Sequence, residues 1–87
     1  MDNQEDIGAR TEELTIALQS VVESFQPYRA EHRPDRADFD RWLIWNDQTS
    51  ERLGIVALEG PYERSLSLLE MKVLLRSRAM DLLRKVA

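Results

Sequence analysis

Few residues in this sequence have side chains suited to catalysis. His32 is the only histidine among the 87 residues, and there is no cysteine. A histidine acts as a general base only in a shaped pocket that also holds a group to orient its ring. His32 stands between Glu31 and Arg33 in a polar stretch, so we expect it to be an exposed loop residue. The lack of cysteine excludes disulfides, thiolate metal sites and cysteine nucleophiles. We therefore predict no catalytic residue and no enzyme.

Three aspartates, Asp35, Asp38 and Asp40, form an acidic cluster before the tryptophan-containing segment. Carboxylate oxygens bind hard cations, so a small metal protein or enzyme is one hypothesis for this cluster. The spacing lacks the central glycine of a calcium loop, and Arg36 and Arg41 interleave with the acids. Local arginine–aspartate pairs on a solvated loop explain the pattern better. We predict no metal, no cofactor and no small-molecule substrate.

Phosphate or nucleic-acid binding has partial support. Gly8, Gly54 and Gly60 are isolated, whereas a phosphate cradle needs a glycine-rich turn leading into a helix. The net charge is −4, yet residues 62–87 hold six bases and three acids. A dimeric nucleic-acid-associated regulator that uses this basic C-terminal helix is therefore our alternative hypothesis. Its bases do not share one helical face, and an acidic chain repels a polyanion, so nucleic acid is not the favoured partner.

The first element that must position these residues is a helix over about residues 4–26. Its apolar side chains recur every seven residues along two seams. The members of those seams are Ile7, Leu14 and Val21, and Thr11, Leu18 and Phe25. Pro27 ends the helix, because the residue before a proline avoids the α conformation. Residues 27–38 then read as a polar connector.

A β-hairpin is predicted over about residues 39–59. Aromatic and β-branched residues from Phe39 to Trp45 favour a strand, and residues 46–51 have the composition of a turn. Residues 53–58 form the returning strand. A helix over residues 34–45 is the competing interpretation, since Phe39, Trp42 and Leu43 also match helical spacing.

The last element is a helix over about residues 61–85. Pro61 suits its first position, and Ser67 with Glu70 three residues on is an alternative N-terminal cap. The fold class is therefore α+β: a single domain over residues 1–87 with the order α-β-β-α, in which two helices pack on a hairpin.

This predicted fold exposes more apolar surface than the chain can easily cover. In an extended segment, Trp42 and Ile44 face one side and Leu43 and Trp45 the other, so both faces of the hairpin are apolar. On a helical wheel the last helix has two apolar stripes rather than one. One stripe is Leu68, Met71, Leu75, Ala79, Leu82 and Val86; the other is Leu66, Leu69, Val73, Met80 and Leu83.

Two arrangements would cover this surface. The helices can clamp the hairpin from both sides, or a second chain can supply the cover, most simply as a two-fold homodimer. Pairing two hairpins edge to edge would also hide exposed strand edges. We favour the second chain, which makes the protein a small acidic regulator, adaptor or assembly factor that binds itself or another protein. The predicted interface residues are Trp42, Ile44, Trp45, Val56, Met71, Leu75, Arg76 and Leu82.

A cytoplasmic location is expected. The uninterrupted apolar runs are only four residues long, from Trp42 to Trp45 and from Ile55 to Leu58, whereas a membrane span needs about 20 residues. The acidic start, Asp2 to Asp6, differs from the basic and then apolar start of a secretory signal. Absence of disulfides in so small a domain also fits a reducing compartment.

Overall fold

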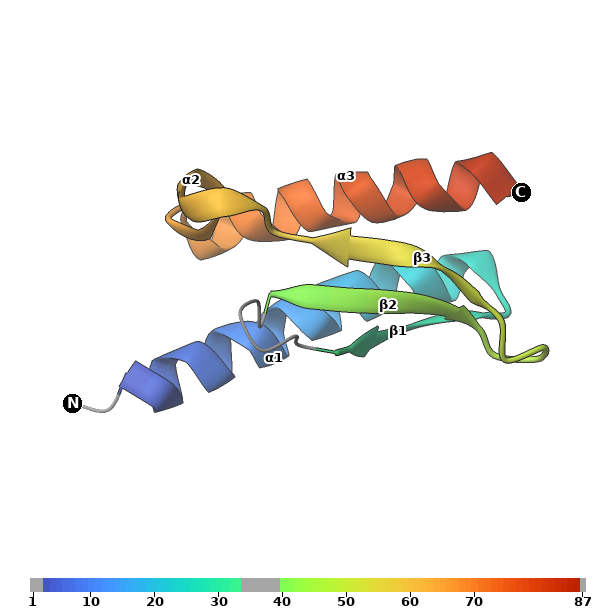
Figure 1. Cartoon of the computed structure of the whole chain (residues 1–87), viewed down its shortest axis with the longest axis horizontal. Helices are drawn as coiled ribbons and strands as arrows, with labels where there is room; N and C mark the ends of the chain where they lie inside the picture. The colour runs from blue at the N-terminus through green and yellow to red at the C-terminus, as the bar shows by residue number, and fades with distance from the viewer. Residues whose placement is uncertain (1–2, 34–39, 87) are drawn as a thin grey trace.

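Two long helices and a three-stranded antiparallel sheet make up the chain (Figure 1). The computed structural model describes residues 3–33 and 40–86, with the side chains of residues 9–33 and 40–85. The elements in chain order are α1 Asn3–Val22, the short 3-10 helix η1 Glu23–Phe25, β1 Tyr28–His32, β2 Arg41–Asn46, β3 Arg52–Ala57, α2 Gly60–Arg64 and α3 Leu68–Val86.

The α1 helix buries one stripe of the predicted heptad pattern. Leu14 and Leu18 are fully buried, and Val21 and Val22 are buried one turn further on. The predicted seams are confirmed at Leu14, Leu18 and Val21, whereas Val22 is buried although it lies outside both seams, and η1 extends the helical path to Phe25. Ile7 falls outside the described side chains.

The sheet has the strand order β1-β2-β3, so β2 is the central strand. The predicted hairpin is confirmed by β2 and β3, and the competing helix over residues 34–45 is wrong from Arg41 onward. The polar connector over residues 27–38 is wrong at Tyr28–His32, which forms β1 and pairs with β2. This strand alternates inward Tyr28, Ala30 and His32 with outward charged residues, so its apolar content is too low to indicate a strand.

The predicted last helix is divided into α2 and α3. Pro61 lies in the first turn of α2 as predicted. The Ser67 hydroxyl then accepts the Glu70 N–H at 3.2 Å, and the Glu70 carboxylate accepts the Ser67 N–H at 3.2 Å. This reciprocal capping box lowers the pKa of the Glu70 carboxyl, through the hydrogen bonds that Ser67 makes by its side chain and by its backbone. The cap therefore starts α3 at the alternative position in the prediction.

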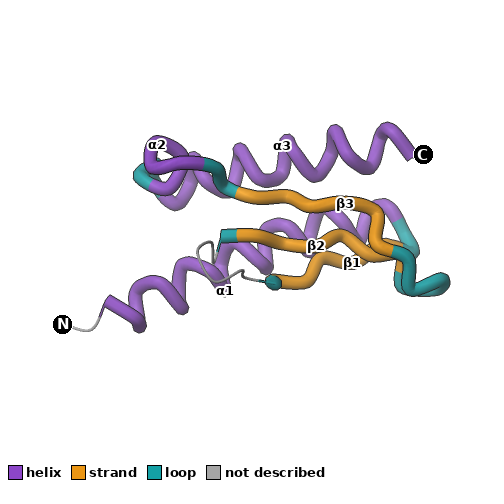
Figure 2. The backbone as a smooth tube through the Cα atoms, viewed as in Figure 1, coloured by secondary structure: helices purple, strands orange, loops and turns teal. Residues whose placement is uncertain are grey.

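Both long helices cover the same face of the sheet and run in the same direction along it (Figure 2). The core brings Trp42 and Ile44 of β2 and Val56 of β3 against the inner stripes of α1 and α3. The arrangement in which the helices clamp the hairpin from both sides is therefore wrong. The opposite face of the sheet carries no helix among the described residues.

A close approach between α3 and β3 completes this packing. A Cβ atom added to Gly54 would lie 2.8 Å from both methyl carbons of Leu82. Glycine at this position therefore lets α3 settle against β3.

Candidate protein interface

Five of the eight predicted interface residues lie in the core of the chain itself. Their exposed fractions are 2% or less, and the residues are Trp42, Ile44, Val56, Met71 and Leu75. A partner that docks on this folded chain contacts none of them. The two long helices cover the inner face of the sheet, and the third strand, β1, was absent from the predicted fold. The structure therefore buries these side chains more fully than the predicted hairpin with two helices would.

The remaining three predicted residues separate onto different surfaces. Trp45 lies half-buried on the outer face of the sheet. Leu82 is half-buried against Gly54. Arg76 is exposed on α3, on the side that faces away from the sheet. The structure therefore does not gather the predicted residues into one site.

The outer face of the sheet is largely covered by its own charged side chains. Leu43, in the central strand, is only 6% exposed although no described helix lies over it. The Arg29 guanidinium lies 6.0 Å from the centre of the Trp45 ring and forms ion pairs with Asp47 at 2.8 Å and Glu31 at 3.4 Å. Among the described side chains, Ile55, at 48% exposed, is the one large apolar residue of this face that is exposed.

Glu31 joins two arginines on this face. Its carboxylate accepts a hydrogen bond from Arg33 Nε at 3.0 Å as well as the Arg29 contact. The hydrogen bond from Arg33, followed by the charge of Arg33 and by Arg29, lowers the pKa of the Glu31 carboxyl against the opposing effect of desolvation. The pair with Glu31 helps to hold the Arg29 guanidinium next to the Trp45 ring.

The largest exposed apolar side chains gather on the helices instead. Leu69 and Val73 of α3 are 72% and 59% exposed, and Ile16 of α1 is 62% exposed. Met80 is half-buried and shares their side of α3. We call the surface that contains Ile16, Leu69, Val73 and Met80 the helical outer face. Leu69, Val73 and Met80 belong to the second predicted stripe of α3 and remain at the surface, whereas Leu83 of the same stripe is fully buried together with Met71, Leu75 and Ala79 of the first stripe.

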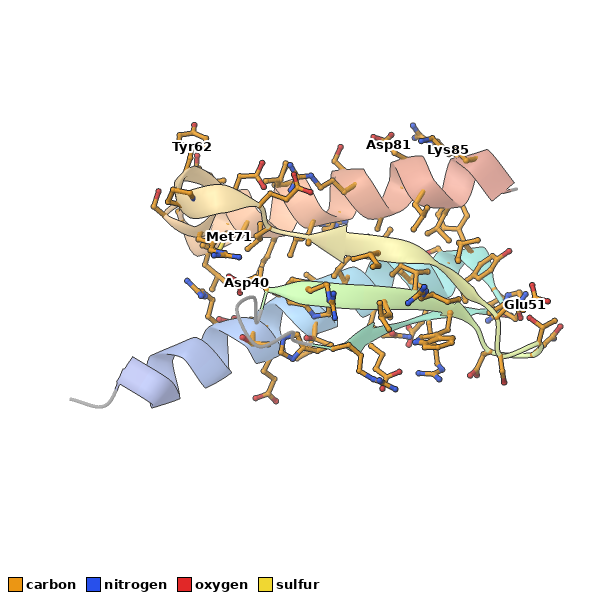
Figure 3. The ribbon with its side chains drawn as sticks, in the orientation of Figure 1. Asp40, Glu51, Tyr62, Met71, Asp81 and Lys85 are labelled. Carbon is orange, nitrogen blue, oxygen red and sulfur yellow. The ribbon has the colours of Figure 1, made fainter. Side chains whose placement is uncertain are left out.

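Tyr62 extends the apolar surface toward α2. It is 75% exposed and points away from the body of the molecule, whereas Met71 points inward (Figure 3). A shallow groove that includes Tyr62, Leu66 and Val73 runs between α2 and α3. The helical outer face is thus open along α3 and into this groove.

Charged residues border the helical outer face. Arg76 and Arg84 are exposed on α3, and Lys72 lies 3.6 Å from Glu13 of α1 across the groove between the two helices. That groove, lined in part by Ile16, is open to solvent. An apolar centre with a charged rim has the composition of a protein interface.

Each edge strand of the sheet has one backbone group bonded to a side chain of a helix. On β1, the Ala30 N–H donates to Gln19 Oε1 of α1 at 2.9 Å. On β3, the Ala57 carbonyl accepts a hydrogen bond from Arg78 Nη1 of α3 at 2.7 Å. Side chains that occupy edge groups disfavour strand addition at those positions, and β1 already covers the β2 edge of the predicted hairpin.

Arg78 also holds α2 against α3 through Glu63. Its two terminal nitrogens lie 2.6 Å from the two Glu63 carboxylate oxygens, and the Glu59 N–H donates to the same carboxylate at 2.7 Å. The hydrogen bonds from Arg78, and next the one from Glu59, lower the pKa of Glu63 from 4.5 to about 2.

Stability should therefore fall as the pH drops from 4.5 toward 2, because the unfolded chain binds a proton at Glu63 before the folded chain does. We expect the melting temperature of Glu63→Gln to change less across this window than that of the parent protein. Thermal melts followed by circular dichroism between pH 7 and the acid limit measure this difference. The control is Glu51→Gln, in the exposed turn between β2 and β3, which should keep the parent slope. Parallel curves for the parent and Glu63→Gln would contradict the assignment.

His32 and Asp40, which the sequence analysis considered for catalysis and metal binding, lie close to other side chains of the chain. His32 is not an exposed loop residue: it is half-buried on β1, with its ring centre 5.2 Å from that of Trp42. Asp40 is fully buried and lies 3.6 Å from both Arg10 and Arg64. Asp35 and Asp38 fall outside the described residues. Within residues 3–33 and 40–86, no three acidic or histidine side chains are placed to hold a metal ion.

Sequence reasoning missed two features of this surface. Ile16 lies off the predicted seams of α1, and its only signal is that it is a large apolar residue on the polar side of the wheel. The pairing of Asp40 with Arg10 and Arg64 has no signal in the sequence, because the three residues come from distant segments.

A search of family models, of curated proteins and of solved structures finds no match to this chain. Of the helices in the described part, none has the length and apolarity to cross a membrane.

Proposed function

We propose that this protein is a non-enzymatic interaction module, a small acidic regulator, adaptor or assembly factor, and that it binds protein through the helical outer face. The observation that carries the proposal is the exposure of Leu69 and Val73, at 72% and 59%, on a helix whose opposite side already buries Met71, Leu75, Ala79 and Leu83. Contiguous exposed apolar side chains on a small folded domain mark interaction sites.

The charge pattern favours protein over nucleic acid as the partner. The apolar residues Leu69, Val73 and Met80 occupy the middle of the surface, and charges of both signs surround them. A nucleic-acid site instead has lysine and arginine side chains along the contact itself, because these positive charges neutralise the phosphates. Arg78, one of the bases of the C-terminal segment, is already held by Glu63.

Site-specific photo-crosslinking in cells tests the proposal. A benzophenone amino acid at position 73 should crosslink to a protein that mass spectrometry identifies. The matched control places the same group at Thr49, in the exposed β2–β3 turn, and should give no such product. The purified partner should then bind the parent protein at least tenfold more tightly than it binds Val73→Glu.

Three outcomes would overturn the proposal. Crosslinks at position 73 to nucleic acid alone would transfer the function to the alternative hypothesis. An absence of any crosslink specific to position 73 would remove the helical outer face as the site. Equal affinity of the identified partner for the parent and Val73→Glu would do the same.

A further inference from the structure

We infer that the occupant of the helical outer face is a second copy of this chain. The inference rests on the proposed function and names its partner. It is drawn from the distribution of charge between α1 and α3, which the fold places side by side as one layer.

The α1 part of this layer is acidic. Helical geometry places Glu12, Glu13, Ile16, Ser20 and Glu23 within an outward arc of about 100°. Among the described side chains of α1, from Ala9 onward, no base lies in this arc; Arg10 is on another side of the helix, next to Asp40. The α1 surface is therefore acidic around one exposed apolar residue, Ile16.

The α3 part is the opposite. Leu69, Val73, Arg76, Met80 and Arg84 fall within an arc of about 80°, and none of them is acidic. Lys72 lies at the edge of this arc next to α1, whereas Glu70 and Asp81 lie beyond its other edge. The α3 surface is thus basic around an apolar stripe, and it complements the α1 surface of another copy.

The parallel direction of the helices decides how two copies pair. A two-fold axis that runs along the helices brings α1 of each copy onto α3 of the other, and both contacts form at once. An axis across the helices would instead place α1 against α1, acid against acid. Charge complementarity therefore selects the first arrangement, which is closed and leaves no unpaired copy of the surface.

The Glu13–Lys72 contact at 3.6 Å sets the level of the two helices. From that level, Val73 lies about 1.5 Å and Ile16 about 4.5 Å along the helices, so each Ile16 meets Val73 of the other copy. Glu23 lies about 15 Å and Arg84 about 18 Å along, so these two charges also meet within one turn.

The extent of the molecule leaves room for an interface of standard size. The molecule extends 42 × 21 × 20 Å, so its broad face offers at most about 900 Å², close to the roughly 800 Å² per partner of a standard interface. Ile16, Leu69, Val73 and Met80 of both copies would form the apolar centre, with Arg76, Arg84, Glu12 and Glu23 at the rim.

Sedimentation velocity from micromolar to near-millimolar concentration tests the inference. The parent protein should sediment at twice the 10.2 kDa chain mass. Val73→Glu should weaken association at least tenfold, and Asp81→Lys, exposed on α3 outside the basic arc, should leave it unchanged. Circular dichroism melts of each variant confirm that the fold is intact.

Charge exchange makes the test specific to this pairing. Arg84→Glu and Glu23→Lys should each weaken self-association about fivefold, because each creates two like-charge contacts per dimer. Mixing these two variants should restore association as a heterodimer, since both contacts between positions 23 and 84 then pair an acid with a base. A purely structural effect of either substitution would not be rescued by mixing.

The outcomes separate this inference from the proposed function. A parent protein that stays monomeric, while position 73 crosslinks to a different protein, overturns the second copy as occupant but leaves the interaction module. A dimer that Val73→Glu does not weaken, or singly substituted chains that do not recover on mixing, overturns the arrangement. If position 73 gives no crosslink and the parent protein is monomeric, both the second copy as occupant and the proposed interaction site are overturned.

Discussion

Replacing Trp42 with alanine is expected to lower the free energy of unfolding by about 3–5 kcal/mol, the cost of deleting a large aromatic side chain from a core. Trp42 is fully buried in the central strand and packs against both long helices. A small domain is stable by only about 5–15 kcal/mol, so this one substitution removes much of the total. Urea unfolding followed by circular dichroism measures the change.

A hydrogen-bond chain fixes the orientation of Trp42. Its Nε1–H donates to the Thr15 hydroxyl at 2.8 Å, and that hydroxyl donates to the Thr11 carbonyl at 2.8 Å. Trp42→Phe keeps a six-membered ring but loses the first of these bonds and the pyrrole part of the indole, so we expect it to cost at least about 1–2 kcal/mol and less than Trp42→Ala.

Trp45→Ala is the matched control for Trp42→Ala. Trp45 lies half-buried on the outer face of the sheet, beneath Arg29, so its loss leaves a site that water and neighbouring side chains can fill. The cost should be clearly smaller than that of Trp42→Ala. Equal costs at the two positions would mean that the inner face is not the principal core.

Asp40→Asn is expected to be the second most damaging change, at about 3 kcal/mol. Its carboxylate is fully buried and lies 3.6 Å from Arg10 of α1 and 3.6 Å from Arg64 of α2. Asparagine keeps the shape and removes the charge that these two guanidinium groups face. Removing one partner of a buried ion pair costs about 3–5 kcal/mol, and the lower end applies because both arginine side chains are partly exposed, at 27% and 34%.

The control for this prediction is Asp47→Asn. Asp47 also pairs with an arginine, Arg29 at 2.8 Å, but its side chain is 64% exposed, so the cost should stay below about 1 kcal/mol. A double-mutant cycle of Asp40→Asn with Arg64→Met should show coupling between the two positions. If Asp40→Asn unfolds at the same urea concentration as the parent protein, the ion pairs of Asp40 with Arg10 and Arg64 do not stabilise the packing of α1 and α2 against the sheet.

The outcome for β1 shows where local pattern falls short. The Ser67–Glu70 box starts the last helix, as expected from residues a few positions apart, whereas α1 ends at Val22, earlier than Pro27 predicts, and only η1 continues to Phe25. The strand Tyr28–His32 has no such signal, since one of its faces is charged and its pairing with β2 bridges an intervening loop. Because the predicted fold lacks this third strand, it underestimates how fully the chain itself buries Trp42.

The candidate surface shows the same division. The two apolar stripes of α3 are readable from the sequence, and so is their excess over what one core needs. Which stripe becomes the core is not readable, because it depends on the side from which α1 and the sheet approach. Met71 and Leu75, which the sequence predicts at an interface, are buried, whereas Leu69 and Val73 remain outside.

Local residue patterns are enough to establish the α+β class, the cap that starts α3 and the turn between β2 and β3, because each depends on residue types within a few positions of one another. Long-range packing settles the rest: Trp42 is inside and Trp45 outside, Asp40 meets two arginines, and the acidic and basic helices lie side by side. Those facts depend on contacts between segments far apart in the chain, where the gain from burial is set by the whole packed arrangement and not by any local pattern.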